Sequence, residues 1–300
     1  PLFRIGTNSI SPRKTARVGV TGKNKKNGLQ AKNKKPGESG AAQTGSKTNT
    51  TRQTGTNFIK KPVTEQPSSS SGDGGARIDL MVVYTPGAAK MFGGEKGIKA
   101  RINVVMTRSN KSFSDSKIKA SMKLVHAGQV SYTSTGNKGA DLRNMHGKTD
   151  LKKQVVGLRK KYKADLVTLV TEKDGGGVGW LLNRKSPIPH LGFNVVCANS
   201  LYYSVLAHEI GHNLGCMHDK GNSGYKPMDD YGYGWRFRAN DGESSRQYRT
   251  IMAYAPGNRI GHFSNPNVKY NGVPTGVASS ADNVRVINVT AAIVAQNSEQ

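Results

Sequence analysis

Residues 208–219 read HEIGHNLGCMHD, and the spacing of the histidines in this stretch decides how the rest of the chain is interpreted. His208 and His212 are four residues apart, so on a helix their rings project from one face, one turn apart. Gly215 can adopt the positive φ that ends such a helix, after which the chain can turn back and bring His218 toward the other two rings. The stretch therefore predicts a three-histidine metal site at the end of a helix.

The residue after the first histidine is a glutamate, and its position suits a different task from that of the histidines. Glu209 lies beside the metal-facing side of the helix, outside the set of ligands. Three protein ligands leave the fourth position of a tetrahedral zinc ion open for water, whose pKa zinc lowers from about 15.7 to about 7. A nearby carboxylate can then accept the proton. We interpret His208, His212 and His218 as ligands of one catalytic Zn²⁺ and Glu209 as a general base.

Two simpler interpretations compete with a catalytic metal site. The histidines could be buried polar residues with hydrogen-bond partners, or they could hold a structural zinc ion. A structural site closes its fourth position with another Cys or His. The one nearby candidate, Cys216, stands between Gly215 and His218 and cannot act independently of them. The complete pattern therefore favours catalysis.

The composition divides the chain into two parts. Residues 1–76 carry 14 Lys and Arg against 3 Asp and Glu, whereas residues 77–300 carry 31 against 16, within a net charge of +26. The first part is rich in Lys, Asn, Gly and Ser and has few apolar side chains, so we expect it to be flexible, as a linker or the remnant of a pro-segment. Only this basic segment offers a route to nucleic acid, and it lacks interleaved aromatic residues.

Apolar periodicity in residues 77–300 predicts an α/β domain. Strands and helices alternate, which is typical of a mostly parallel sheet with crossover helices. The predicted elements are a buried strand at 78–84, an amphipathic helix at 95–112, a strand at 118–124, a helix over 151–162 capped by Thr149 or Asp150, and a buried strand from Ala164. The glycines at 175–179 lead into a short strand at 178–182, whose edge could pair with an extended peptide.

Several features of the sequence bear on where the protein acts, on its cysteines and on calcium binding. No apolar run approaches the length of a membrane span, and we expect a secreted protein whose signal peptide is not part of the given sequence. Cys197 and Cys216 are too few for a disulfide framework and could form one bridge or remain free thiols. Calcium is possible, but no calcium-binding loop is recognisable.

The motif and its downstream partner resemble those of the metzincin metallopeptidases. His208, Glu209, His212 and His218 match the metzincin zinc signature, and RTIMAYA supplies Met252 for the turn that follows it. The fuller resemblance, over residues 78–296, is to bacterial reprolysin-like enzymes of the peptidyl-Asp metalloendopeptidase kind. It rests on IDLMVVYTPGA, LVHAGQVSYTSTGN, YGYGWR and FSNPNVKYNGVPTG as well as the zinc signature.

The resemblance implies a twisted sheet with helices in an upper subdomain and a smaller, irregular lower subdomain that contains the Met-turn and a C-terminal helix. Met252 would form a hydrophobic floor under the metal, and Tyr254 would donate its phenol to the zinc or to the developing oxyanion. The last helix would begin near Ser280 and bury a stripe of Val286, Val289 and Ile293. Related enzymes often carry a cysteine in the Gly-rich segment; here Cys216 could replace it as the partner of Cys197.

Taken together, the sequence predicts that residues 77–300 form a zinc endopeptidase domain, acting as a monomer on proteins or peptides. An acidic residue on the prime side of the scissile bond is a reasonable preference, because basic residues lie near the motif in sequence. These are Arg236, Arg238, Arg246, Arg249 and Arg259. The alternative is an inactive or latent metzincin scaffold that binds anionic partners through its basic surface. Asp73 could cap the zinc in a latent form, although an acidic linker residue is the simpler interpretation.

Overall fold

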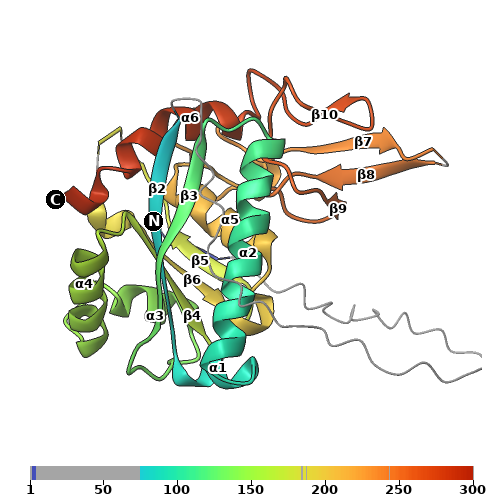
Figure 1. Ribbon diagram of the computed structural model, residues 1–300. Helices are drawn as coiled ribbons and strands as arrows, with labels where there is room; N and C mark the ends of the chain where they lie inside the picture. The colour runs from blue at the N-terminus through green and yellow to red at the C-terminus, as the bar shows by residue number, and fades with distance from the viewer. Residues whose placement is uncertain (1, 5–74, 184, 187, 243, 300) are drawn as a thin grey trace, which may run out of the picture. The chain divides into compact units, whose positions relative to one another are not determined.

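The computed structural model describes residues 2–4, 75–183, 185–186, 188–242 and 244–299 (Figure 1). The strands are β1 (Leu2–Arg4), β2 (Ala76–Tyr84), β3 (Ala120–Gln129), β4 (Leu166–Thr171), β5 (Gly177–Trp180), β6 (Phe193–Cys197), β7 (Arg236–Asn240), β8 (Ser245–Arg249), β9 (Asn258–Arg259), β10 (Lys269–Tyr270) and β11 (Val273–Pro274). The helices are α1 (Pro86–Met91), α2 (Glu95–Asp115), α3 (Lys138–Asn144), α4 (Asp150–Tyr162), α5 (Tyr203–Asn213) and α6 (Asn283–Val294), with short 3₁₀ turns η1 (Pro189–Leu191), η2 (Ala198–Ser200), η3 (Lys220–Asn222) and η4 (Asn297–Glu299). Most of the segment predicted to be flexible, including Asp73, lies outside the described residues.

The main sheet has six strands in the order β1-β5-β6-β4-β2-β3. Strands β2, β3, β4 and β6 are parallel, whereas β5 runs antiparallel to β6, and β1 runs antiparallel to β5. Helix α2 connects β2 to β3, and α3 and α4 connect β3 to β4 (Figure 1). The predicted α/β domain with a mostly parallel sheet is therefore confirmed.

Helices cover both faces of this sheet. Ile78, Leu80 and Val82 of β2 belong to the apolar cluster beneath α2, α5 and α6, whereas Met81 and Val83 belong to the cluster beneath α3 and α4. Burial on both faces explains why the sequence of β2 is apolar at nearly every position instead of alternating. The helix carrying the two histidines of the motif, α5, thus packs directly on the sheet core.

Two predicted helices begin where the sequence indicated. Helix α2 starts at Glu95 and buries Ile98 and Ile102, although it extends three residues beyond the predicted end. Helix α4 is capped by Thr149, whose hydroxyl oxygen accepts the backbone N–H of Lys152 at 3.1 Å. None of the helices in the described ranges is both long and apolar enough to cross a bilayer.

The last helix differs from its prediction in both its start and its buried face. Helix α6 is capped by Asp282, which accepts the N–H of Arg285, and not by Ser280. Val289 is 45% exposed, so the predicted stripe is wrong. The buried face is formed by Val284, Val286, Ile287, Thr290, Ala291 and Val294. Val286 belongs to both the predicted and the observed set, so the buried face is turned around the helix axis from the predicted one.

A three-stranded sheet, β7-β8-β9, lies in the C-terminal part and was not predicted. Strand β7 does alternate, with Phe237 and Ala239 between polar residues, but each strand has only five residues and β8 has Tyr248 as its one buried residue, so the signal is weak. Phe237, Ala239, Tyr248 and Ile260 form a small apolar cluster of their own on it. This sheet leads into the segment that borders the histidine motif.

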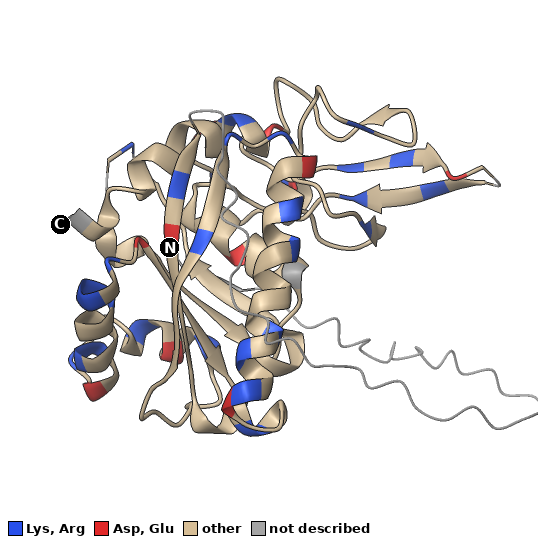
Figure 2. Cartoon of the chain, viewed as in Figure 1, with Lys and Arg blue, Asp and Glu red and all other residues tan. Residues whose placement is uncertain are grey.

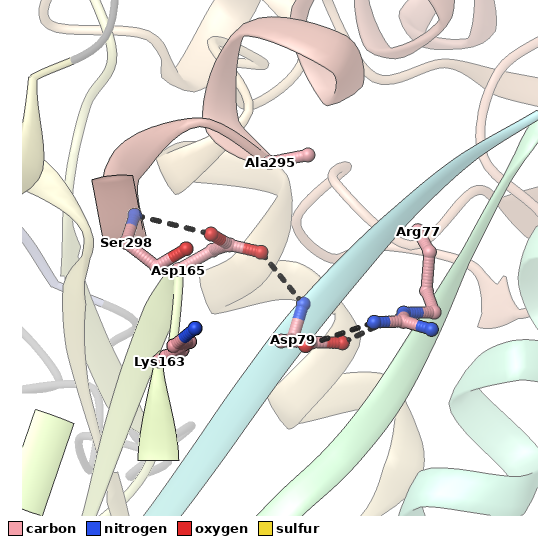
Figure 3. A pocket seen from close by; sticks show the side chains of 6 residues that line it. All are labelled: Arg77, Asp79, Lys163, Asp165, Ala295 and Ser298. Carbon is pink, nitrogen blue, oxygen red and sulfur yellow. Dashed lines mark hydrogen bonds and ion pairs between the residues drawn. The ribbon is translucent and has the colours of Figure 1, made fainter. Parts of the chain in front are cut away.

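A polar pocket away from the histidine motif shows how the end of the chain is fastened to the sheet (Figure 3). Asp165 lies just before β4 and is 2% exposed. Its carboxylate accepts the backbone N–H of Asp79 at 2.8 Å and that of Ser298 at 3.2 Å. Asp165 therefore ties β2 and the last turn of the chain to β4, and it takes no part in the metal centre.

Replacing Asp165 by Ala is expected to destabilise the fold. The change leaves two backbone N–H groups without their acceptor, which costs roughly 2–4 kcal/mol of unfolding free energy. Denaturant unfolding of the full chain measures this, with the exposed Asp230→Ala as a control expected to stay within about 0.5 kcal/mol of the wild type. Equal stability of both variants would contradict the fastening role of Asp165.

Candidate metal centre

The three histidines of the motif converge as their spacing predicted. His208 and His212 lie on α5, which ends at Asn213, and Gly215 follows with a φ of 87°. The Cys216 N–H donates back to the Gly211 carbonyl at 2.9 Å, which turns the chain sharply. As a result, the Nε2 atoms of His212 and His218 are 3.1 Å apart. The ligand atoms of the three histidines lie within 4.8 Å of one another.

Backbone carbonyls orient two of the rings. His208 Nδ1 lies 2.9 Å from the Ile251 carbonyl oxygen, and His212 Nδ1 lies 2.9 Å from the Cys216 carbonyl oxygen. Because a carbonyl only accepts, each Nδ1 carries the proton and each Nε2 lone pair faces the centre. In the described part of the chain, His208 Nε2 is buried with no hydrogen-bond partner. A buried lone pair of this kind fits a metal ion.

The protonation state of the histidines also suits metal binding. Burial lowers the pKa of His208 and His212 well below their ordinary value, and the neighbouring histidines lower it further. Burial likewise lowers the pKa of His218 to about 4. The three imidazoles are therefore neutral near pH 7, which is the form that coordinates metals.

Glu209 is the buried carboxylate of the centre. Neither of its carboxylate oxygens has a hydrogen-bond partner among the described residues. Burial raises the pKa of Glu209 well above its ordinary range, while the positive charges of Lys138 and Arg259 lower it. Strand β5 approaches so closely that a β-carbon at Gly177 would stand 2.4 Å from Glu209 Oε1. Any larger residue at this position would force the Glu209 side chain to move.

Met252 and Tyr254 both lie close to the histidine helix or its loop. Met252 is fully buried in the same apolar cluster as Ile210 of α5. The ring of Tyr254 contacts that of His218 in a tilted arrangement, with centroids 4.0 Å and planes 31° apart. Asp219 accepts the Tyr254 backbone N–H at 2.9 Å and so joins the end of the motif to the turn after Met252. The sequence did not indicate this last contact.

The two cysteines do not form a bridge. Cys197 and Cys216 are both free and buried. The Thr171 hydroxyl lies 3.9 Å from the Cys197 sulfur, whereas the Cys216 sulfur lies 3.7 Å from the Asn283 carbonyl oxygen. Of the two alternatives that the sequence left open, a bridge or free thiols, the structure shows the free thiols. Burial raises the pKa of the Cys197 thiol to about 12, so it is protonated and unreactive at neutral pH.

The sheet with helices on both faces defines an α/β protein. Its three buried, convergent imidazoles suit it to hold a metal ion. The family model Reprolysin_5, metallo-peptidase family M12, matches residues 75–264, and the chain belongs to this family. Metallopeptidases of this family use one catalytic zinc ion. The resemblance to reprolysin-like metzincins drawn from the sequence is confirmed.

The chain is similar to several proteins named peptidyl-Asp metalloendopeptidase. It is 32% identical to the one from Stenotrophomonas maltophilia (strain R551-3) over 73% of this chain and 52% of that protein. It is 31% identical to the one from Xanthomonas campestris pv. campestris (76% and 53%) and 28% identical to the one from Pseudomonas aeruginosa (73% and 40%). The chain thus spans about half the length of the first two of these relatives.

A solved structure titled "Structure of a chaperone-substrate complex" is similar in fold alone. The match has a TM-score of 0.59 and 21% sequence identity, and it covers 74% of this chain and 36% of the other. Sequence identity at this level carries no functional information. The match supports the layered α/β architecture independently of the histidine motif.

Proposed function

We propose that this protein is a zinc-dependent endopeptidase in which His208, His212 and His218 hold the metal. The observation that carries the proposal is the convergence of three buried, neutral imidazoles beside a buried carboxylate. When bound, zinc supplies Lewis-acid activation of water and of the scissile carbonyl. The test is zinc content and casein hydrolysis by the full chain. Absence of both would overturn the proposal.

Glu209 is proposed as the general base. Its position beside the histidines lets it accept the proton of the attacking water, and it can later return that proton to the leaving amine. A carboxylate with a raised pKa is a better proton acceptor than an exposed one, because its conjugate acid is weaker. The close packing of Gly177 limits the positions that the carboxylate can adopt.

Tyr254 and Met252 are proposed in supporting roles. The ring of Tyr254 lies against that of His218, and its phenol would donate to the oxyanion that forms during peptide hydrolysis. Burial raises the pKa of Tyr254 above its ordinary value, which keeps the phenol protonated and able to donate. Met252, fully buried near the histidine helix, would form the floor of the centre.

We also propose that the enzyme prefers an acidic residue on the prime side and that Arg259 provides the counter-charge. Ile251 links the histidine helix α5 to the segment that follows β9. Its carbonyl oxygen contacts His208 Nδ1, and its N–H donates to the His262 carbonyl at 2.8 Å. Arg259 therefore lies on the segment that runs beside the centre. Burial is the main cause of the lowered pKa of His208 and His218, and the positive charge of Arg259 makes a smaller contribution in the same direction. The names of the relatives agree with this preference.

The other arginines near the motif also contact neighbouring groups, two of them next to the motif or its Met-turn. Arg236 forms an ion pair with Asp219 at 2.7 Å, and Arg249 donates to the carbonyls of Ala253 and Gly257. The remaining two, Arg238 and Arg246, lie on the β7–β8 hairpin and contact Ser245 and Asp241. Arg259 is the one whose charge acts on several groups of the centre.

Arg259→Ala is expected to remove the acidic preference selectively. Loss of a hydrogen bond to a charged group costs about 1.5–3 kcal/mol, so kcat/KM for a peptide with Asp on the prime side should fall roughly 10- to 100-fold. The matched peptide with Ala should change about threefold or less. Arg238→Ala serves as the control arginine. Equal losses on both peptides would contradict the role of Arg259.

The setting of the enzyme is proposed on the resemblance and on the composition of the chain. We infer that residues 77–300 act as the catalytic domain of a secreted monomer, and that residues 1–76, which also supply β1, are otherwise a linker or a pro-segment remnant. Lys and Arg residues occur on α2, α4 and the β7–β8 hairpin, among other elements (Figure 2).

A further inference from the structure

Strand β5 is the part of the sheet nearest to the candidate catalytic glutamate. Gly177 of β5 approaches the Glu209 carboxylate, and a β-carbon at Gly179 would stand 3.0 Å from the Glu209 carbonyl oxygen. One edge of β5 pairs with β6, with Val178 opposite Val195. A peptide paired to the other edge would therefore lie one strand spacing, about 4.8 Å, from the backbone that contacts Glu209.

That other edge is occupied by this chain's own strand β1. Leu2 is opposite Trp180, Phe3 is opposite Gly179, and Arg4 is opposite Val178, in antiparallel register. The sequence suggested that an extended substrate would pair with the strand at 178–182. In the structure, β1 uses the same edge, over three of the four residues of β5.

We propose that β1 is a built-in competitor of substrate, docked on the edge of β5 that an extended peptide would use. The proposal rests on the endopeptidase function proposed above. A strand edge offers one row of N–H and C=O groups, so two peptides cannot pair with it at once. Substrate must therefore displace β1 before it can pair with β5.

The strength of this competition follows from the covalent connection. Three residues of backbone pairing are weak on their own, but the covalent connection through the chain keeps the strand at an effective concentration of up to about millimolar. We expect the competition to be partial and reversible. It should raise KM with little change in kcat, because β1 blocks binding and leaves the metal centre intact.

The experiment compares the full chain with a variant lacking residues 1–5. The matched control lacks residues 67–71, PSSSS, and keeps β1. We expect the first deletion to lower KM for a peptide substrate about threefold or more, and the control to leave it unchanged. The peptide PLFRIG, added to the first variant, should inhibit competitively, whereas the scrambled peptide RGLIPF should not.

Hydrogen exchange provides a readout that does not depend on activity. Deleting residues 1–5 should speed exchange of the β5 amides that point away from β6, since they lose their partners. Unchanged exchange would overturn the docking of β1. Faster exchange with unchanged KM would overturn the competition.

Inhibition that grows with enzyme concentration would show that β1 of one molecule pairs with β5 of another. That result would overturn a competitor built into the same chain. Absence of hydrolysis by every variant would instead overturn the endopeptidase function, and exchange would still decide the docking.

Discussion

Glu209→Gln is expected to slow peptide hydrolysis strongly and to leave zinc bound, as for a carboxylate that works on water without binding the metal. General acid–base catalysis contributes about 10²- to 10⁴-fold, so kcat/KM should fall by about that factor. The amide occupies nearly the same volume as the carboxylate, so the histidines need not move. Casein or peptide hydrolysis and metal analysis of the same preparation measure the two effects.

Stability separates this role from a structural one. Burial raises the pKa of Glu209, which means that the folded state disfavours its charged form. Removing the charge should therefore leave the melting temperature unchanged or raise it. Glu95→Gln, at an exposed glutamate at the start of α2, is the matched control and should retain full activity. A Glu209→Gln variant that loses zinc, or one that remains active, would contradict the role assigned to Glu209.

The parts of the fold that the sequence predicted are those with local signals. The strand at the start of the domain and the helix from Glu95 were predicted because their apolar periods differ clearly. The convergence of His212 and His218 was predicted because helix geometry and one glycine determine it within a few residues. A short motif of this kind needs no knowledge of the distant chain.

The parts that the sequence did not predict depend on distant or ambiguous contacts. The pairing of Phe3 with Gly179 joins segments far apart in the chain, and neither sequence identifies its partner. The cap of α6 was placed two residues too early, because Ser280 and Asp282 are both good cap residues. The position of Arg259 beside the centre depends on β9 pairing with β8, and a strand of two residues has no periodic signal.

His218→Ala should eliminate zinc binding and activity together. His218 lies on the loop after α5, and its Nε2 is within hydrogen-bonding distance of His212 Nε2. Losing one of three ligands leaves two imidazoles, too few to hold the metal tightly. We expect zinc content to fall from about one per chain to near zero, and hydrolysis to fall at least about 10³-fold. His190→Ala, at an exposed histidine, should change neither.

The same variant tests whether the metal also stabilises the fold. A ligand present at about 1,000 times its dissociation constant adds about 4 kcal/mol, so chelation of the wild type should lower its melting temperature by on the order of 10 °C. Chelation should not affect His218→Ala, because that variant holds no zinc to remove. Adding zinc back should restore the wild type alone. Full zinc content in His218→Ala would mean that His218 is not a ligand, and the three-histidine centre would have to be abandoned.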